Sequence, residues 1–383
     1  MLVVRGDLFI RDNDKFYIVG SGSNQFYKLV AMVMGPYKMM AWIIDKGNYN
    51  LENLEVFDKT MGVELVINSD KVSLFKKINI IRKAVKNADC LNFKLPLPHS
   101  IIGCLWAILY NKKYVVESGG DLLKSLWYHE GLSYKLIALP MNLIVILEHR
   151  LAKHIIYVSK NFLQEIYPSK ARQLGCSDAV IYITPESVLA KRIDKITNKR
   201  GVFSLGLIGA TQASYRGHDT LIKAASLLKN RGYDIKVSFL GGGTADDKRR
   251  KCAEKCNMSD RIEFCGRIKH SEVLSWIDNI DVLVMPTLVE SLGRAVIEAM
   301  SRGCPVIGTY ETALREQIGA DCLVHARNVQ EIASAIERII KHKDYALMCA
   351  RENYYRAMKY SSDLTYKFRK EFYDEFYDLE NIR

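Results

Sequence analysis

Residues 281–309 read DVLVMPTLVESLGRAVIEAMSRGCPVIGT, and this segment decides the fold class. An apolar, strand-like run opens it, a helical stretch containing Glu298 follows, and a second strand-like run closes it at 305–309. Strand, helix and strand in this order predict two parallel strands joined by a helical crossover, because parallel neighbours need a long connection. Such units build sheets that helices cover on both faces.

The same alternation continues in both directions along the 383-residue chain. Helical patterns at 74–88, 220–232 and 271–279 and one from about Val329 lie between apolar runs. The further runs that we predict as strands are residues 1–4, 39–44, 63–68, 113–118, 154–159, 179–183, 203–209, 235–243, 261–266 and 322–326. We therefore predict an α/β protein with two Rossmann-like domains facing each other across a cleft, each presenting the carboxyl ends of its strands to ligand.

The domain boundary is predicted from a lapse in this pattern. Residues 184–201 are polar, charged and non-periodic, so we interpret them as a linker between domains of residues 1–185 and 186–360. The remaining residues, 361–383, carry phenylalanines at helical spacing. We expect a C-terminal helix that packs back toward the N-terminal domain, and a helix that binds a partner protein is the alternative.

Composition limits the class of protein. The longest uncharged apolar run, residues 136–147, has 12 residues and contains Pro140 and Asn142, whereas a membrane span needs about 20. The first 30 residues carry several charges, which argues against a signal peptide. Nine cysteines, an odd and scattered set, favour a reducing, cytoplasmic setting. The net charge of +12 is compatible with nucleic acid, anionic lipid or phosphorylated substrates as partners.

Two acids in the opening segment point to chemistry. If a helix begins near Ser291, Glu298 lies among apolar neighbours, where a carboxylate is costly without a partner. In one interpretation the role of Glu298 is purely structural: it either forms a buried salt bridge or lies at an exposed position of the helix. The other is a pair of ligand hydroxyls on Glu298, with a diphosphate at the helix N-terminus held by N–H groups around Ser291, Leu292 and Gly293.

A family resemblance rests on these residues and on others in the same order. Residues 286–309 resemble the Glu-x7-Glu signature of the retaining GT-B glycosyltransferases (glycosyl transferases group 1, family 4), with Glu290 and Glu298 as the two acids. Residues 205–228, LGLIGATQASYRGHDTLIKAASLL, resemble the stretch that opens the second domain of that family, and VSFLGGG, RIEFCGRI and DVLVMPT follow in its order. Over residues 90–168 the chain is similar to a polysaccharide-assembly branch of the group.

The resemblance implies roles for particular residues. Glu290 corresponds to the acid on the transferred sugar and Arg216 to the basic residue on the diphosphate, and these two are the catalytic candidates. The residues implied in nucleotide-sugar binding are Gly209, Arg267, Ile268, Ser291, Leu292, Gly293 and Glu298. Asp7 and Asp121 are candidates on the acceptor side, the N-terminal domain being the acceptor-binding one. No metal site and no cofactor are expected, and a UDP-sugar is the favoured donor.

The chain also departs from the family pattern. Ala210 stands where many members have a second Arg, so one cation on the leaving diphosphate is missing unless Thr211 or Arg294 compensates. Gly119-Gly120 stands where a His is common. TYETA (309–313) replaces a glycine pair, and the early glycine loop is recognisable only as Gly6-Asp7 at a turn. These departures bear on the acceptor and the donor sugar.

Other patterns favour simple structural readings. Asp12-Asn13-Asp14 imitates a metal-binding Asp-x-Asp but is typical of a solvated turn, and GGGT (241–244) does not complete a dinucleotide motif. The pair Cys252 and Cys256 lacks a second ligand pair for a metal. We interpret the histidines at 129, 149 and 154 as surface or packing residues. The basic face of helix 74–88 is either solvated or attracted to anionic lipid headgroups.

The sequence therefore predicts a retaining glycosyltransferase that moves a sugar from a nucleoside diphosphate to a hydroxyl of a glycan or lipid-linked glycan in surface polysaccharide biosynthesis. We expect it in the cytoplasm, with a possible peripheral contact at the inner, anionic face of the membrane. A nucleotide-sugar epimerase of the same fold is the first alternative. A basic nucleic-acid-binding protein is a remote one, since no recognisable module interleaves its lysines with aromatic residues.

Overall fold

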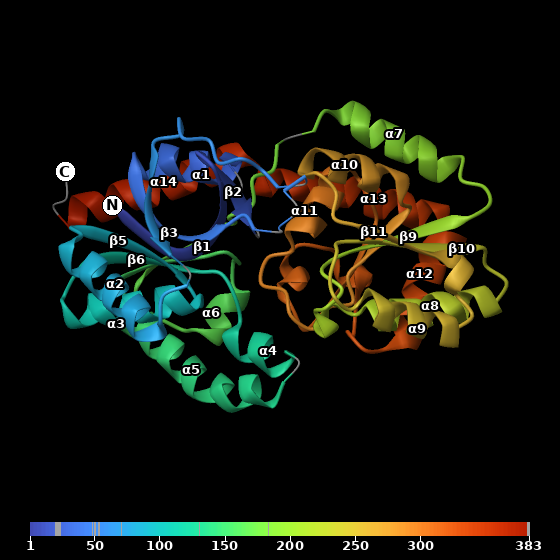
Figure 1. The fold of residues 1–383 in the computed structure, drawn as a ribbon. Coiled ribbons are helices and arrows are strands. Elements are labelled where there is room, and N and C mark those ends of the chain that lie inside the picture. The colour runs from blue at the N-terminus through green and yellow to red at the C-terminus, as the bar shows by residue number, and fades with distance from the viewer. Residues whose placement is uncertain are drawn as a thin grey trace. The chain divides into compact units, whose positions relative to one another are not determined.

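The chain forms two compact α/β units in a computed structural model (Figure 1). The first unit comprises Met1–Leu123, Ile137–Val180 and Ser362–Arg383, and the second comprises Lys124–Leu136 and Ile181–Ser361. The structure describes all residues except 20–23, 48, 50, 53, 70, 130, 183 and 381–383. The chain therefore passes from the first unit to the second and returns to the first for its last segment.

The first unit is built on an eight-stranded sheet of order β4-β3-β1-β5-β6-β7-β8, with β2 paired to β1. Every pairing is parallel except the β1–β2 hairpin. Its strands are β1 (Leu2–Asp12), β2 (Lys15–Val19), β3 (Tyr37–Asp45), β4 (Val63–Ser69), β5 (Cys90–Leu95), β6 (Lys113–Ser118), β7 (His154–Tyr157) and β8 (Arg172–Gly175).

Helices cover both faces of this sheet. Figure 1 shows α1 and α14 on one face and α2, α3 and α5 on the other. The helices are α1 (Asn24–Met34), α2 (Leu74–Asn87), α3 (Pro98–Leu109), α6 (Phe162–Ile166) and α14 (Ser362–Leu379), together with α4 (Leu122–Trp127) and α5 (Leu132–Leu151), of which the residues from Lys124 to Leu136 belong to the second unit. Sequence features account for two of the starts: the Ser73 hydroxyl accepts from the Lys76 amide at 3.4 Å to cap α2, and a proline stands in the first turn of α3.

The second unit has a six-stranded, all-parallel sheet of order β11-β10-β9-β12-β13-β14. The strands are β9 (Phe203–Ile208), β10 (Ile235–Leu240), β11 (Ile262–Gly266), β12 (Val282–Val284), β13 (Val306–Thr309) and β14 (Leu323–Val324). The order runs outward from β9 in one direction and then from β12 in the other, as in a doubly wound Rossmann fold. The prediction of two Rossmann-like domains is confirmed.

The helices of the second unit follow the predicted crossovers. They are α7 (Glu186–Thr197), α8 (His218–Asn230), α9 (Asp246–Lys255), α10 (His270–Asn279), α11 (Arg294–Ser301), α12 (Val329–Lys341) and α13 (Lys343–Ala357). Short 3₁₀ turns are η1 (Ser214–Arg216), η2 (Ser259–Arg261), η3 (Ala313–Glu316), η4 (Ala320–Cys322) and η5 (Met358–Tyr360). Helix α12 illustrates the pattern: Ile332, Ile336 and Ile339 are buried, and the Asn328 side chain caps its first turn.

Several predictions about elements were wrong. Residues 179–183 form no strand where the structure describes them, because only Ile181 makes a bridge, to Ser361. The supposed linker 184–201 contains α7, whose Leu189 and Arg192 are buried although its surface is charged. The predicted boundaries at 185/186 and 360/361 compare with unit boundaries at 180/181 and 361/362. The Gly6-Asp7 turn lies instead inside β1, at an irregularity in its pairing with β3.

The last helix, α14, completes the core of the first unit. Its Phe372, Tyr373 and Phe376 are buried in the same hydrophobic cluster as residues of α1 and β3. The Tyr373 hydroxyl accepts from the Asn92 amide at 2.7 Å. Apolar burial of this size stabilises by several kcal/mol, so the tail is a structural part of the first unit.

Buried ionic groups lie next to this core. The Lys94 ammonium is 2.6 Å from Asp178 and 3.9 Å from Glu117, and Arg369 of α14 lies 3.2 Å from Glu117. Burial acts to raise the pKa of Glu117, but Arg369, Lys94 and Arg5 outweigh it and lower that pKa to about 2. The network therefore keeps Glu117 ionised, and it joins β5, β6 and α14.

Helix α5 contradicts the prediction that no segment reaches the length and composition of a membrane span. It has 20 residues because it extends beyond the 12-residue run at both ends, and only 28% of its apolar window is buried. Its inner side is nevertheless tied to the first unit. His149 Nε2 lies 2.9 Å from the Ser118 hydroxyl, and the Tyr167 hydroxyl donates to Asn142 at 3.0 Å.

Glu148 is a buried acid on the inner side of α5. Its side chain is fully buried, and neither carboxyl oxygen has a hydrogen-bond partner within the described residues. Burial raises the pKa of Glu148 to about 9. The carboxyl group is therefore protonated and neutral at pH 7, as a group in apolar surroundings must be when no cation faces it.

We predict that Glu148 makes the stability of the chain depend on pH. Its folded pKa of about 9 lies above the value of 4.5 for an exposed glutamate, so the unfolded chain releases this proton between those values and stability falls as pH rises. At pH 7 the loss relative to pH 4 is about 3 kcal/mol. In urea titrations from pH 5 to pH 8, Glu148→Gln should remove this slope and be more stable than wild type at pH 8.

Glu64→Gln provides the control, because it removes an exposed carboxylate from the same unit. This variant should follow the pH profile of wild type. Equal pH slopes for wild type and Glu148→Gln would contradict the assignment.

Candidate functional site

The candidate site lies where the strand order of the second unit reverses. Strand β9 pairs with β10 on one side and with β12 on the other, so the loops after β9 and β12 diverge at the carboxyl edge of the sheet. Ligands of open α/β sheets bind at this point. The loop after β9 leads to Arg216, and the loop after β12 leads to Glu290.

The structure brings the two predicted catalytic residues into contact. Arg216 Nη1 lies 2.5 Å from Glu290 Oε2, and both side chains are largely buried. Burial acts to lower the pKa of Arg216, but Glu290 and Tyr215 outweigh it, so the net shift is upward. A backbone hydrogen bond of 2.9 Å from the Leu288 amide to the Tyr215 carbonyl joins the two loops. The site thus holds a permanent cation beside a carboxylate.

Helix α9 fixes the loop that carries Arg216. The fully buried Arg249 donates through Nε and Nη2 to the Thr211 carbonyl and pairs with Asp219 at 2.7 Å. The Thr211 hydroxyl donates to Asp246 at 2.5 Å. Because that hydroxyl is engaged, Thr211 does not replace the cation that Ala210 leaves out. The sequence pattern had not singled out Arg249, which positions this loop.

Glycines let these loops approach one another. An added Cβ at Gly209 would lie 3.3 Å from the Cγ and Cδ atoms of Arg216, so the arginine side chain lies against this glycine. Gly241 has a φ of +126°, and its Cβ would be 2.5 Å from the Gly209 carbonyl oxygen. Gly242 lies in turn against the Arg267 side chain. Gly209, Arg216 and Arg267 therefore border one edge of the sheet, and Ile268 follows Arg267 directly.

The helix after Glu290 begins later than predicted. Helix α11 starts at Arg294, with Gly293 as its N-cap, so Ser291 and Leu292 precede it. The three residues Ser291, Leu292 and Gly293 are buried, with Gly293 against Leu314 and Gln317 of the next loop. The loop's tight packing explains the late start. The expected N–H groups remain at the helix N-terminus, one turn before Glu298 rather than two.

Glu298 is separated from the Arg216–Glu290 pair in its contacts. Its Oε1 lies 3.5 Å from Nε2 of His270, the first residue of α10, and its side chain is 18% exposed. Its surroundings are thus neither fully apolar nor a tight ion pair, since His270 is 74% exposed. The carboxylate is accessible to a ligand hydroxyl, which is the role that the sequence resemblance implies. That role stays a prediction.

One buried side chain near this loop carries no sequence signal. Gln317 is 3% exposed, and neither amide atom has a hydrogen-bond partner in the described parts of the chain. Its Oε1 would lie 2.8 Å from a Cβ at Gly293. In the adjacent TYETA stretch, the Thr309 hydroxyl donates to the Thr287 carbonyl at 2.7 Å, so hydroxyl contacts hold the backbone where the family pattern has glycines.

The remaining predicted residues lie in the first unit. Asp7 is in β1, 3.4 Å from Arg5, and Asp121 is a buried residue between β6 and α4. Their roles toward an acceptor stay predictions. Asn13 and its neighbour Asp14 form the β1–β2 turn, as expected for a solvated turn. Among the described residues, no group of His, Cys, Asp or Glu side chains is arranged to hold a metal ion.

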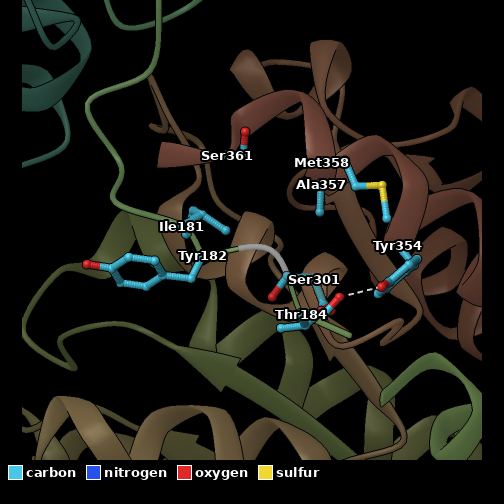
Figure 2. A pocket seen from close by; sticks show the side chains of 8 residues that line it. All are labelled: Ile181, Tyr182, Thr184, Ser301, Tyr354, Ala357, Met358 and Ser361. Atoms are coloured by element: carbon cyan, nitrogen blue, oxygen red, sulfur yellow. Dashed lines mark hydrogen bonds between the residues drawn. The ribbon is translucent and has the colours of Figure 1, made fainter. Parts of the chain in front are cut away.

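A small hollow in the second unit is lined mainly by apolar side chains. It is lined by residues near the end of α13 and by Ile181, Tyr182 and Thr184, and Figure 2 shows Tyr354 pointing to Thr184. The Tyr354 hydroxyl donates to the Thr184 carbonyl at 2.5 Å. Apart from this bond its lining is mainly apolar and uncharged, with Ile181 and Met358 among the residues drawn in Figure 2. The described residues that line this hollow include no charged side chain for catalysis.

The arrangement at the sheet edge suits an anionic ligand. Arg216 supplies a guanidinium that can bind phosphate bidentately, and the start of α11 supplies the positive end of a helix dipole. Glu290 supplies an acceptor for hydroxyl groups beside them. A molecule with phosphates flanked by sugars presents the complementary groups.

Comparisons with known proteins agree with this chemistry. Residues 194–356 match the family described as glycosyl transferases group 1. The chain is 29% identical over 305 residues to protein CapJ of Staphylococcus aureus, a match covering 79% of this chain and 75% of CapJ. It is 24% identical over 166 residues to the putative colanic acid biosynthesis glycosyltransferase WcaL of Escherichia coli, covering 42% of this chain and 41% of WcaL.

A solved structure extends the likeness to the whole fold. HepE of Anabaena in complex with UDP is similar over 98% of this chain and 100% of HepE, with a TM-score of 0.70. The two sequences are 14% identical, so this likeness concerns the fold.

We predict that Gly217, at the start of α8, cannot be replaced without loss of stability. Its φ is +82°, and a Cβ there would collide with the Pro286 carbonyl oxygen of the loop that leads to Glu290. Gly217→Ala should therefore cost about 3 kcal/mol or more in chemical unfolding. Gly232→Ala is the matched control, because Gly232 has a φ of +90° with no atom within 4 Å of the added Cβ, and it should cost about 1 kcal/mol. Equal losses would contradict the steric explanation.

Proposed function

Because this chain belongs to the glycosyl transferases group 1, we propose that it transfers a sugar from a UDP-sugar to a hydroxyl of a glycan or lipid-linked glycan in polysaccharide assembly. The contact between Arg216 and Glu290 at the reversal point of the second sheet carries the proposal. It places one diphosphate-binding cation and one hydroxyl-binding carboxylate within reach of a single substrate.

The proposed reaction retains the configuration at the anomeric carbon. The bond from that carbon to the phosphate oxygen breaks, and a bond to the acceptor oxygen forms on the same face. The leaving phosphate takes the acceptor proton, so atoms and charge balance. Arg216 and the N–H groups at the start of α11 stabilise the negative charge that develops on the phosphate. Because these groups supply that stabilisation, the proposal needs no divalent metal.

The division of labour between the two acids follows from their places. Glu290 contacts Arg216 and therefore lies next to the diphosphate, where it is suited to hydroxyls of the transferred sugar. Glu298 lies one helical turn past the start of α11, where it is suited to the ribose hydroxyls at the other end of the diphosphate. Arg267 and Ile268 border the same sheet edge and are proposed to contact the base through their backbone.

Similarity supports the choice of donor and acceptor class. HepE, with the same fold, was solved with UDP, and WcaL is described as a putative colanic acid biosynthesis enzyme. We extend both to this chain as a UDP-sugar donor and a polysaccharide-type acceptor. All nine cysteines are unpaired in the structure, which supports a reducing, cytoplasmic location. A nucleotide-sugar epimerase is distinguished by its products, since it would convert the donor without an added acceptor.

We predict that single replacement of either catalytic candidate reduces turnover by orders of magnitude. Arg216→Ala removes the leaving-group cation, and Glu290→Ala removes the contact to the transferred sugar; loss of such a contact costs about 10²–10³-fold in kcat. The measurement is release of UDP in the presence of an acceptor glycan. Addition of EDTA should leave the wild-type rate unchanged.

The control is another Arg–Glu pair in the same unit. Arg231 lies 2.7 Å from Glu337, with side chains 35% and 18% exposed. Arg231→Ala and Glu337→Ala should retain wild-type turnover. The double variant Arg216→Ala/Glu290→Ala leaves no unpaired buried charge, so a purely structural pair would regain activity with stability. Recovery of turnover in that double variant would overturn the proposed roles.

We further predict that UDP stabilises the second unit against heat. A ligand present at a hundredfold its Kd adds about 2.7 kcal/mol to native-state stability, which raises Tm by several degrees. UDP should raise Tm more than GDP or ADP, and Arg216→Ala should abolish the increase while Arg231→Ala retains it. If GDP raised Tm more than UDP, the donor would be a guanosine rather than a uridine nucleotide sugar. If no nucleotide raised Tm, the proposed nucleotide site would be wrong.

A further inference from the structure

Helix α5 carries a ridge of exposed leucines, with the exposed Arg150 in the same arc near its C-terminal end. The ridge consists of Leu132, Leu136, Leu139, Leu143, Leu147 and Leu151, which are 49–73% exposed. At 100° per residue they fall within an arc of about 120°. The buried residues of the helix, which include Ala138 and Val145, lie on the opposite side. The ridge is therefore an apolar surface that no other part of the chain covers, as far as the structure describes it.

The exposed charged side chains that the structure describes on α5 itself are all basic. The charged side chains exposed along α5 and just after it are Lys135, Arg150 and Lys153. The one acid of α5, Glu148, is fully buried and points away from the ridge. An apolar strip whose described exposed charges on the same helix are cations is complementary to an anionic lipid leaflet, which is apolar in its interior and negatively charged at its surface.

A second helix on the same face of the first sheet has the same character. Helix α2 exposes Leu74 and Phe75, the latter to 86%, and its 14 residues include Lys76, Lys77 and three further cations without any acid. Figure 1 shows α2, α3 and α5 on one face of the sheet. The opposite face is covered by α1 and α14, where α14 is rich in acids.

From this geometry we propose that the leucine ridge of α5 inserts into the headgroup region of an anionic membrane, with the helix lying in the plane of the surface. The inner side of α5 is anchored by Ser118, Tyr167 and Ser169, through contacts to His149 and Asn142. These bonds hold the helix on its sheet, so it lies on the membrane rather than crossing it. This inference does not depend on the proposed sugar transfer.

The test is co-sedimentation of the full chain with vesicles. The probes are vesicles of phosphatidylcholine alone and of phosphatidylcholine mixed with phosphatidylglycerol, at low and high salt. Wild type should bind the mixed vesicles and dissociate in part at high salt, because the cations contribute to binding. The variant Leu139→Gln/Leu143→Gln/Leu147→Gln should lose about tenfold or more in partitioning, since three leucines no longer enter the interface.

A matched triple variant separates the ridge from general surface apolarity. Met32→Gln/Leu364→Gln/Leu379→Gln removes three exposed apolar side chains from α1 and α14, on the other face of the same sheet. This variant should bind vesicles as wild type does. Arg150→Glu should weaken binding to mixed vesicles and leave the weak binding to phosphatidylcholine unchanged.

Two further measurements are the depth of the ridge in the bilayer and the oligomeric state of the chain. Leu143→Trp should gain fluorescence that lipids brominated near the headgroup quench more than lipids brominated at the chain end; the reverse order would indicate a spanning helix and overturn the proposal. A wild type that fails to bind mixed vesicles, or a ridge variant that binds as well as wild type, would also overturn it. The proposal would also be overturned if wild type were a dimer, the ridge variant were a monomer and the two bound vesicles equally well. The ridge would then be an interface between two copies of the chain.

Discussion

The reversal of strand order beside β9 is the constraint on which the candidate site depends. The loops at the carboxyl edge of a parallel sheet lead to the helices that cover its faces. The loops after β9 and β12 diverge because the strand order reverses between these two strands. Arg216 and Glu290 come from the two loops at that point and are 74 positions apart in the chain. Gly217 lets the backbone of one loop approach Pro286 of the other closely, and Gly209 leaves room for the Arg216 side chain within its own loop.

The second unit was predictable from its sequence because local pattern and tertiary structure agree there. Buried parallel strands read as short apolar runs, and α8, α10 and α12 read as amphipathic helices between them. The family resemblance assigned Arg216 and Glu290 to one substrate but did not predict their contact, and periodicity does not show which loops meet. Gln317 and Arg249 act through burial among distant neighbours, and nothing in their local sequence distinguishes them.

The first unit was predicted less well, for physical reasons that differ by element. Strand β5, CLNFKL, contains Asn92 and Lys94, whose burial depends on Tyr373, Asp178 and Glu117 from other elements, so it reads as polar. One helix of the second unit was missed for a similar reason: α7 reads as a linker because it is charged, although its buried Arg192 donates to the carbonyls of Ile277 and Ile280. In each case a polar residue is buried by partners remote in sequence, which a local pattern cannot show.

The return of the chain to the first unit for α14 has a consequence for the order of biosynthesis. Phe372, Tyr373 and Phe376 fill the core beside α1, and Arg369 pairs with Glu117, yet these residues follow the whole second unit along the chain. The sheet of the first unit is therefore synthesised before part of its core and before one of the cations that face Glu117, and both come only after the second unit. A chain that ended after α13 would lack α14, and the first unit would then lack part of its hydrophobic core.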